Sequence, residues 1–474
     1  MKVLRVFLIL ILAVAFVSCG TFPENPELVR YDPEKGYRFE NLNLGDKNTD
    51  SLFVVLAFSG GGTRAASFAY GVLEALRDTQ IVWKGETKRL LDEVDIISSV
   101  SGGSFTASYY ALYRDKLFDG AFEQDFLKKN IEKGLLMATL CPCNWRKLAG
   151  RSYGRSDLAA EYYHSHIFRE ATFGKLIDLG TRPFLMLNAT DMSTGSQFPF
   201  IQDQFDLICS DLASLPVARA VAASSAFPGL LTPLTFENRA GTCQYHEPRW
   251  VELAENDRRI APERADIAED RRSYYQRQPR EYERKFIHLI DGGVSDNVGL
   301  RSILFALETT DPAYSILREI DREIIEKLVI IVVNAATDPQ SKRDEKASVP
   351  GLVNVLTASA TVPLNNYSFD TVNRISTAVE EYNKGAEIRK SCKKILKDVC
   401  PEADLPGGDL YEVDVYLSQV AFDFIENPET RFWFKNLSTN FSLPSKTVDS
   451  LKKMGQELLL SDEQFKRLIS GLLK

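Results

Sequence analysis

The stretch Val94–Ser104 constrains the fold more than any other part of the sequence. It begins with an apolar, partly β-branched run, typical of a strand buried in a parallel sheet, and then breaks at a serine followed by two glycines. A helix is predicted next, over residues 105–112. A serine on a sharp strand-to-helix turn has its hydroxyl pushed out of the sheet, as in the nucleophile elbow G-x-S-x-G. Ser101 and Gly103 fit this pattern, whereas Ser99 replaces its first glycine. Ser101 is therefore the candidate nucleophile.

A similar strand, turn and helix lie upstream. Leu52–Phe58 is an apolar run that ends before three glycines, and small and apolar residues then recur at helical spacing to about Arg77. Three further apolar runs predict buried strands, at residues 182–190, 286–290 and 328–333. Strands that alternate with helices indicate an α/β fold with a mainly parallel sheet, whose sites lie at the carboxyl ends of the strands.

Composition and charge exclude some classes of protein and of partner. The chain has 474 residues, of which 44% are hydrophobic and 26% charged, as in a globular protein. A net charge of −8, with no basic domain, argues against nucleic acid as a partner. Residues 237–285 are dense in Arg, Asp and Glu, which indicates a solvated insertion; the alternative is a lid, or a surface that touches lipid headgroups.

The C-terminal region, residues 341–474, is predicted to be mostly helical. An edge strand is expected within residues 411–420, and Ser461 with Gln464 is a capping-box pattern for the last helix. Because no Gly/Ser/Pro linker precedes this region, we expect it to pack on the core.

The N-terminus predicts export. A basic start and a short apolar run lead into Phe-Val-Ser-Cys, which ends at Cys19 and resembles the lipobox of bacterial lipoproteins. The apolar run is too short for a comfortable membrane span. We expect residues 1–18 to be a signal peptide, Cys19 to be lipidated and residues 19–50 to be a tether; an ordinary signal peptide with an incidental cysteine is the alternative. Because Gly20 stands where a retention aspartate could have been, the outer membrane is favoured over the inner one.

Export to an oxidising compartment would also allow the other cysteines to form disulfides. Six remain besides Cys19, and an even number permits three disulfides in an oxidising compartment. Proximity along the chain favours Cys209–Cys243 and Cys392–Cys400.

A zinc site is a weaker alternative to disulfides for two of the cysteines. Cys141 and Cys143, together with His164 and His166, are four potential zinc ligands, but their one-residue gaps are shorter than usual zinc spacing. Disulfides or free thiols are the preferred interpretation, and no metal site is expected.

An acyl-transfer enzyme needs a nucleophile, a base and donors aimed at the developing oxyanion. Gly60, Gly61 and Gly62 offer consecutive N–H groups at a strand end and a helix N-terminus. A nucleotide phosphate loop is excluded because its lysine is absent, and a tight turn without a ligand is the alternative. Arg64 either adds positive charge behind the anion hole or holds the loop in place.

The base is not expected to be a histidine, because none of the four histidines follows a strand end. His288 lies inside a predicted strand and is expected to point away from its end. Asp291 ends that strand and is followed by two glycines, which allow a close backbone approach. A serine–aspartate dyad follows, with Asp291 as general base; a plain Asp-Gly-Gly turn is the alternative.

Four motifs together resemble the patatin-like phospholipases. They occur in the family's order at Gly60–Arg64, Ser99–Gly103, Ala223–Pro228 and Asp291–Gly293. The resemblance implies a three-layer α/β/α fold, related to the catalytic domain of cytosolic phospholipases, with a catalytic domain at residues 51–340 and no cofactor. It also implies that Ser101 is the nucleophile, that Asp291 is the base, and that the amides of the three glycines and of Gly102 form the oxyanion hole.

The leading hypothesis is a membrane-anchored serine acyl hydrolase that acts on membrane lipids through an acyl-serine intermediate. An acyltransferase or a thioesterase would use the same intermediate. A catalytically silent lipoprotein that binds lipid or a protein partner is the alternative from a different class.

Overall fold

The computed structural model describes residues 24–150, 152–256, 258–276, 283–301, 303, 325–338, 347, 349, 351–399 and 413–473. Its centre is an eight-stranded sheet in the order β10-β9-β1-β4-β5-β8-β7, with β6 paired to β5. The strands are β1 (Leu52–Phe58), β4 (Val94–Val100), β5 (Phe184–Asp191), β6 (Gln197–Pro199), β7 (Leu234–Glu237), β8 (Phe286–Asp291), β9 (Lys327–Asn334) and β10 (Asp414–Ala421). A separate hairpin consists of β2 (Gln80–Trp83) and β3 (Glu86–Arg89).

The sheet is mainly parallel, as predicted. Strands β10, β9, β1, β4 and β5 run parallel to one another, whereas β6 and β8 are antiparallel to β5, and β7 is antiparallel to β8. The predicted edge strand is β10, at one end of the sheet. The antiparallel direction of β8 was not foreseen, because a short apolar run carries no sign of its direction.

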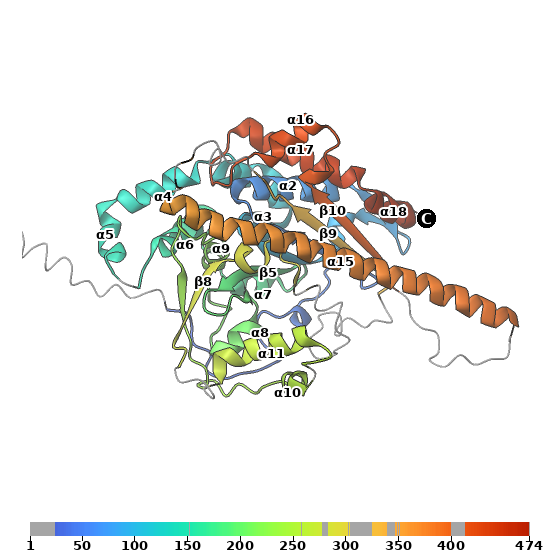
Figure 1. Cartoon of the computed structure of the whole chain (residues 1–474), viewed down its shortest axis with the longest axis horizontal. Helices are drawn as coiled ribbons and strands as arrows, with labels where there is room; N and C mark the ends of the chain where they lie inside the picture. Colours follow the sequence, from blue (N-terminus) through green and yellow to red (C-terminus); the bar gives the residue numbers. More distant parts are fainter. Residues whose placement is uncertain are drawn as a thin grey trace, which may run out of the picture.

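Helices cover the sheet on both sides. Helix α2 (Gly62–Asp78) follows β1, and α3 (Gly102–Tyr113) follows β4. The long helix α15 (Leu352–Val399) runs on the side of the sheet opposite α2 and α17 (Ser445–Ser461), and its end extends beyond the body (Figure 1). The other helices are α4 (Ile131–Leu140), α5 (Pro142–Leu148), α6 (Arg155–His166), α7 (Phe173–Leu179), α8 (Gln202–Phe205), α9 (Val217–Ser224), α10 (Arg249–Asn256), α11 (Pro262–Tyr275), α12 (Gly293–Asp296), α16 (Pro428–Lys435) and α18 (Glu463–Leu472).

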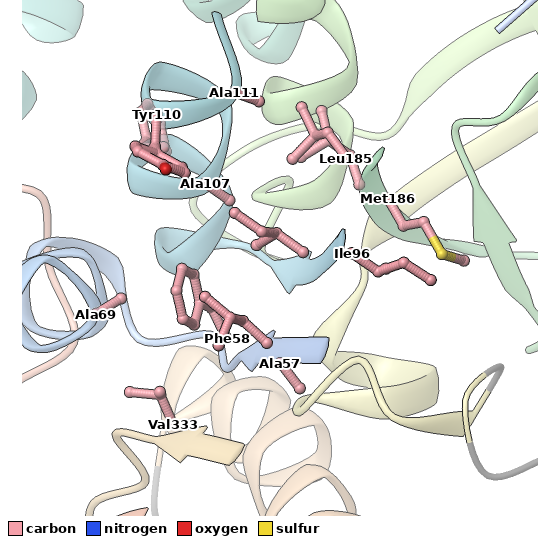
Figure 2. Close-up of a cluster of buried hydrophobic side chains, with 14 of the residues drawn as sticks. Ala57, Phe58, Ala69, Ile96, Ala107, Tyr110, Ala111, Leu185, Met186 and Val333 are labelled. Atoms are coloured by element: carbon pink, nitrogen blue, oxygen red, sulfur yellow. The ribbon is translucent and has the colours of Figure 1, made fainter. Parts of the chain in front are cut away.

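The core lies between the central strands and these helices. Every residue of β1, β4 and β5 is buried, as expected for strands with both faces covered. Figure 2 shows Phe58 of β1 with Ala107 and Ala111 of α3 and Leu185 of β5 in one cluster. The alanines on α3 leave room for the larger strand side chains, so the helix lies close to the sheet.

The C-terminal region packs on this core, as expected. A Cβ atom on Gly71 of α2 would lie 1.9 Å from the Lys452 carbonyl oxygen of α17, and one on Gly455 of α17 would lie 2.5 Å from the Phe68 carbonyl oxygen. The two helices are therefore in backbone contact, which only glycine permits at these positions.

The predicted cap of the last helix is wrong by one residue. Asp462, not Ser461, is the N-cap of α18, and its carboxylate accepts the Phe465 N–H at 2.8 Å. Ser461 still belongs to α17, where its hydroxyl donates to the Leu458 carbonyl at 3.1 Å. Aspartate is a strong N-cap residue, so the helix begins after it.

The predicted pair Cys209–Cys243 forms a disulfide. It lies near the start of the charged insertion, which carries α10 and α11. The insertion is tied to the sheet by Tyr274 of α11, whose hydroxyl donates to the buried Asp191 carboxylate at 2.9 Å. Part of this segment is therefore packed and not only solvated.

The other cysteines give one outcome that fits the preferred interpretation and one that stays a prediction. Cys141 and Cys143 are joined in a disulfide, which leaves no free thiolates there to ligate zinc. Cys392 is an exposed free thiol, and its suggested partner Cys400 lies outside the described residues.

The described part of the chain contains no helix with the length and apolar character needed to cross a bilayer. The predicted signal peptide and Cys19 lie outside the described residues.

Candidate active site

Ser101 stands at the junction of β4 and α3 with the geometry of a nucleophile elbow. Its backbone has φ 48° and ψ −117°, a conformation that non-glycine residues rarely adopt. Such strained backbone persists where its surroundings enforce it, and it concentrates at functional sites. The Ser101 hydroxyl donates a hydrogen bond to Oδ2 of Asp291 at 2.9 Å. The two residues singled out in the sequence are thus in direct contact.

The serine that replaces the first elbow glycine does not disturb this turn. Ser99 lies in the regular ladder of β4, paired with Phe58 of β1 and Leu187 of β5. The tight position is Gly102, where a Cβ atom would lie 2.1 Å from the Gly62 carbonyl oxygen. Glycine is needed there because the elbow and the glycine loop approach each other backbone to backbone.

Asp291 reaches Ser101 through the register of an antiparallel strand. In β5, Asn188 pairs with Val100 of β4, and the next residue, Ala189, pairs with Asp291 of β8. Asp291 therefore stands level with Ser101, across β5, although β8 runs in the opposite direction. The chain then turns at Gly292, where a Cβ atom would lie 2.1 Å from the Asn188 carbonyl oxygen.

The electrostatics of Asp291 suit a general base. Burial raises the pKa of its carboxyl from the usual range to about 6, while hydrogen bonds from the Gly293 N–H and the Ser101 hydroxyl oppose the rise. The Gly293 N–H lies 2.8 Å from Oδ1. A base is most effective when its pKa lies near the working pH, so this carboxylate is ionised at pH 7 yet a better proton acceptor than an exposed one.

The glycine loop presents free amides beside the elbow. Gly61 and Gly62 have φ values of 139° and 60°. Within the described residues, neither of their N–H groups donates to an acceptor, and the same is true of Gly102. The Gly60 N–H, by contrast, donates to the Asn297 carbonyl at 3.0 Å. The arrangement leaves Gly61, Gly62 and Gly102 as available anion donors, while Gly60 anchors the loop.

Arg64 holds the loop from behind. Its Nε donates to the Ala335 carbonyl at 2.9 Å, and its Nη1 donates to the Leu437 carbonyl at 2.8 Å and to the Thr439 hydroxyl at 3.0 Å. Burial lowers the pKa of this guanidinium to about 9, so it remains charged at neutral pH. Its Nη2 would be 2.8 Å from a Cβ atom on Gly61. Both roles considered for Arg64 therefore apply: it holds the loop by hydrogen bonds, and it places a positive charge next to the loop.

A segment of the C-terminal region completes the loop. The Thr63 N–H donates to the Asn440 carbonyl at 2.9 Å. A Cβ atom on Gly62 would lie 2.3 Å from the same oxygen. We call residues 437–441 the C-terminal strap. No local pattern in the sequence predicted this contact, because its partners are far apart along the chain.

The end of α9 holds both members of the Ser101–Asp291 pair. The buried Ser224 hydroxyl accepts the Ser101 N–H at 2.8 Å and donates to the Asn188 carbonyl at 2.7 Å. The Ser224 carbonyl accepts the Gly292 N–H at 3.1 Å, and the Ala226 carbonyl accepts the Asp291 N–H, also at 3.1 Å. The third sequence motif thus positions the elbow and the base together, a role its residue types alone did not reveal.

Histidine has no place at this site. His288 is exposed on β8, and its Nδ1 lies 3.0 Å from the Thr235 hydroxyl. It points away from the strand end, as predicted. Among the described residues, no cluster of His, Cys, Asp or Glu side chains is suited to hold a metal ion.

A mainly parallel α/β sheet with a serine on a strained elbow defines the class of this protein. The family model of the patatin-like phospholipases matches residues 56–304, just over half of the chain. The chain therefore belongs to the patatin-like phospholipase family.

Solved structures give more distant similarities. Human GIVD cytosolic phospholipase A2 matches with a TM-score of 0.36 and 15% identity, over 60% of this chain and 46% of that chain. Its complex with methyl gamma-linolenyl fluorophosphonate matches with a TM-score of 0.31 and 14% identity, over 60% and 41%. VipD from Legionella pneumophila matches with a TM-score of 0.28 and 11% identity, over 94% and 73%. The match thus spans less than half the length of the human enzyme. Comparison with curated proteins gave no match.

Proposed function

We propose that this protein is a serine hydrolase that cleaves fatty acyl esters of membrane lipids through a Ser101–Asp291 dyad. The observation that carries the proposal is the 2.9 Å hydrogen bond from the Ser101 hydroxyl to Asp291, at an elbow that faces a loop with free amides. Membership of the patatin-like phospholipase family supports lipid as the substrate class.

In the proposed mechanism, Asp291 accepts the Ser101 proton while Oγ attacks the acyl carbonyl carbon. The negative charge moves to the carbonyl oxygen, where the Gly61, Gly62 and Gly102 amides can stabilise it. The carbon–oxygen bond to the leaving alcohol then breaks, and the proton on Asp291 passes to that alcohol. An acyl-serine remains.

Water completes the cycle. Asp291 takes a proton from the water, whose oxygen attacks the acyl-serine, and the proton returns to Ser101 as the fatty acid leaves. Helix α3 begins directly after Ser101, so the positive end of its dipole supports the oxyanion in both steps.

The proposal includes a membrane anchor. The lipobox-like sequence that ends at Cys19 supports lipidation of this cysteine after removal of residues 1–18, with residues 19–50 as a tether to the outer membrane. Labelling with a fatty acid should be lost in Cys19→Ser and kept in Cys392→Ser, which removes an exposed thiol elsewhere. Labelling that persists in Cys19→Ser contradicts the anchor.

Hydrolysis of a soluble short-chain ester and of phospholipid vesicles tests the dyad. Ser101→Ala and Asp291→Asn should each lose activity by at least about a thousandfold, because each removes a reacting group. Ser225→Ala and Asp296→Asn are matched controls, since both side chains are buried but their hydrogen bonds go to the Val221 carbonyl and to the Val298 and Arg301 N–H groups, not to Ser101 or Asp291. Full activity in either dyad variant would falsify the assignment.

A further inference from the structure

Helices α4 and α5 follow each other at a sharp bend and project from the body (Figure 1). We call residues 131–148 the α4–α5 hairpin. Its large apolar side chains face solvent: the exposed fractions are 58% for Leu136, 60% for Met137, 57% for Leu140 and 57% for Trp145. Single exposed apolar residues are ordinary, but four large ones within ten positions on two successive helices are unusual and point to an interaction site.

The hairpin is basic although the whole chain is acidic. It carries one acidic residue, Glu132, against Lys133, Arg146 and Lys147, whereas the chain has a net charge of −8. Lys147 is paired with Glu161 of α6 at 2.9 Å, so Lys133 and Arg146 supply the rest of the positive charge. Apolar side chains flanked by a tryptophan and by basic residues are the composition of helices that lie in the interface of an anionic membrane. As a binding partner for the hairpin, this combination of apolar and basic side chains favours an anionic lipid surface over an acidic face on a second copy of this chain.

The first end of the hairpin adjoins the glycine loop. The Ile131 N–H donates to the Phe441 carbonyl at 3.1 Å. Phe441 belongs to the C-terminal strap and follows Asn440, whose carbonyl accepts the Thr63 N–H. The base of the hairpin is therefore joined through two strap residues to the loop beside Ser101.

The helix that follows the hairpin contacts the loop that holds Asp291. Helix α6 follows the hairpin, and the Ser156 N–H donates to the Thr232 hydroxyl at 3.3 Å. Thr232 closes the turn that begins after Ala226, the residue that accepts the Asp291 N–H. On this turn Leu230 is also 63% exposed. The hairpin is thus joined to the glycine loop through the strap, and the helix after it contacts the loop that holds Asp291.

We propose that the α4–α5 hairpin docks on a lipid surface with anionic headgroups, with Leu136, Met137, Leu140 and Trp145 among the upper acyl chains. This inference rests on the proposed function, since an enzyme whose substrate is packed in a membrane must hold its site against that membrane. Docking at this surface would hold the glycine loop, to which the hairpin is joined through the strap, close to the lipid. The disulfide between Cys141 and Cys143 fixes the junction of the two helices.

Fluorescence quenching by brominated lipid tests the docking face. The full-length protein is mixed with vesicles of brominated phosphatidylcholine and phosphatidylglycerol, and tryptophan emission is recorded. Trp145→Phe should lose most of the quenching, because it removes the reporter but keeps an apolar ring. Trp433→Phe is the matched control, since Trp433 is 44% exposed on α16, and it should quench as the parent does. Equal quenching in Trp145→Phe and the parent overturns the proposal.

A second variant tests the role in catalysis. Leu136→Ser combined with Leu140→Ser should lower hydrolysis of anionic vesicles at least about tenfold, because two exposed leucines no longer enter the lipid, and should leave hydrolysis of a soluble ester unchanged. Absence of soluble-ester hydrolysis in the parent would refute the enzymatic function and leave the quenching result intact. Equal quenching by purely zwitterionic vesicles, or a lipid-free dimer that this variant dissociates in sedimentation, contradicts an anionic lipid as the occupant.

Discussion

The hydroxyl of Ser224 accepts the backbone N–H of Ser101 at 2.8 Å and so restrains the residue whose φ of 48° aims the nucleophile. Without this acceptor the elbow is free to relax. Ser224→Ala should therefore lower kcat by on the order of tenfold to a hundredfold, the effect of a small misplacement of a reacting group, with little change in KM.

The control for this prediction lies one residue away. The Ser225 hydroxyl is equally buried but donates to the Val221 carbonyl within α9 at 2.7 Å. Ser225→Ala should keep wild-type kcat. Equal losses in the two variants would mean that the helix end, and not the hydrogen bond to Ser101, matters.

The pH dependence of hydrolysis follows from Asp291. Burial raises the pKa of its carboxyl to about 6, and only the ionised form can accept the Ser101 proton. The value of kcat/KM for a soluble ester should be constant above about pH 7 and fall about tenfold per pH unit well below pH 6. A profile that stays flat down to pH 4 would contradict a desolvated base.

The same raised pKa predicts a stability gain on removing the charge. Because the native pKa is about 6 and the unfolded value is 3.8, the ionised carboxylate opposes folding above pH 6 and has no such effect below about pH 3.8. Asp291→Asn should raise the free energy of unfolding at pH 8 by up to about 3 kcal/mol, at 1.36 kcal/mol per pKa unit. Denaturant titrations at pH 8 and pH 4 check it: the gain should shrink at the lower pH, and a gain of equal size at both would exclude this origin.

The contact of α2 with α17 predicts a large effect from one methyl group. A Cβ atom on Gly71 would lie 1.9 Å from a backbone carbonyl oxygen of α17, so Gly71→Ala should destabilise the protein by about 1–3 kcal/mol. Gly385→Ala in α15 is the control, because the nearest atom is 3.1 Å away at the end of the flexible Arg389 side chain. It should be neutral or slightly stabilising in thermal unfolding. Similar losses in both variants would argue against a specific contact.

The parts of the fold that sequence reasoning predicted share a strong local signal. Strand β1 has the predicted bounds because every residue in it is apolar and buried. The strands β2, β3, β6 and β7 were not predicted, since each has only three or four residues and no continuous apolar run. The direction of β8 was also missed. It follows from pairing with β5 and β7, which no local pattern encodes.

The residues of the site also fall into two groups, those with a local sequence signal and those without one. Ser101, Asp291 and the glycines were predicted because their motifs encode turns and a reactive side chain within a few residues. The hydrogen bond of Ser224 to Ser101 and that of Thr63 to Asn440 were not, because each joins residues more than a hundred positions apart. Such contacts appear only when the whole chain is folded.

The C-terminal strap makes the glycine loop depend on residues that lie far from it in the sequence. The Asn440 and Leu437 carbonyls, which bind Thr63 and Arg64, lie far downstream of the matched family region. The glycine loop beside Ser101 is thus completed by residues that are added to the growing chain long after Ser101 and Asp291. A chain that stops before residue 437 contains both members of the dyad but lacks the Leu437 and Asn440 carbonyls that bind Arg64 and Thr63.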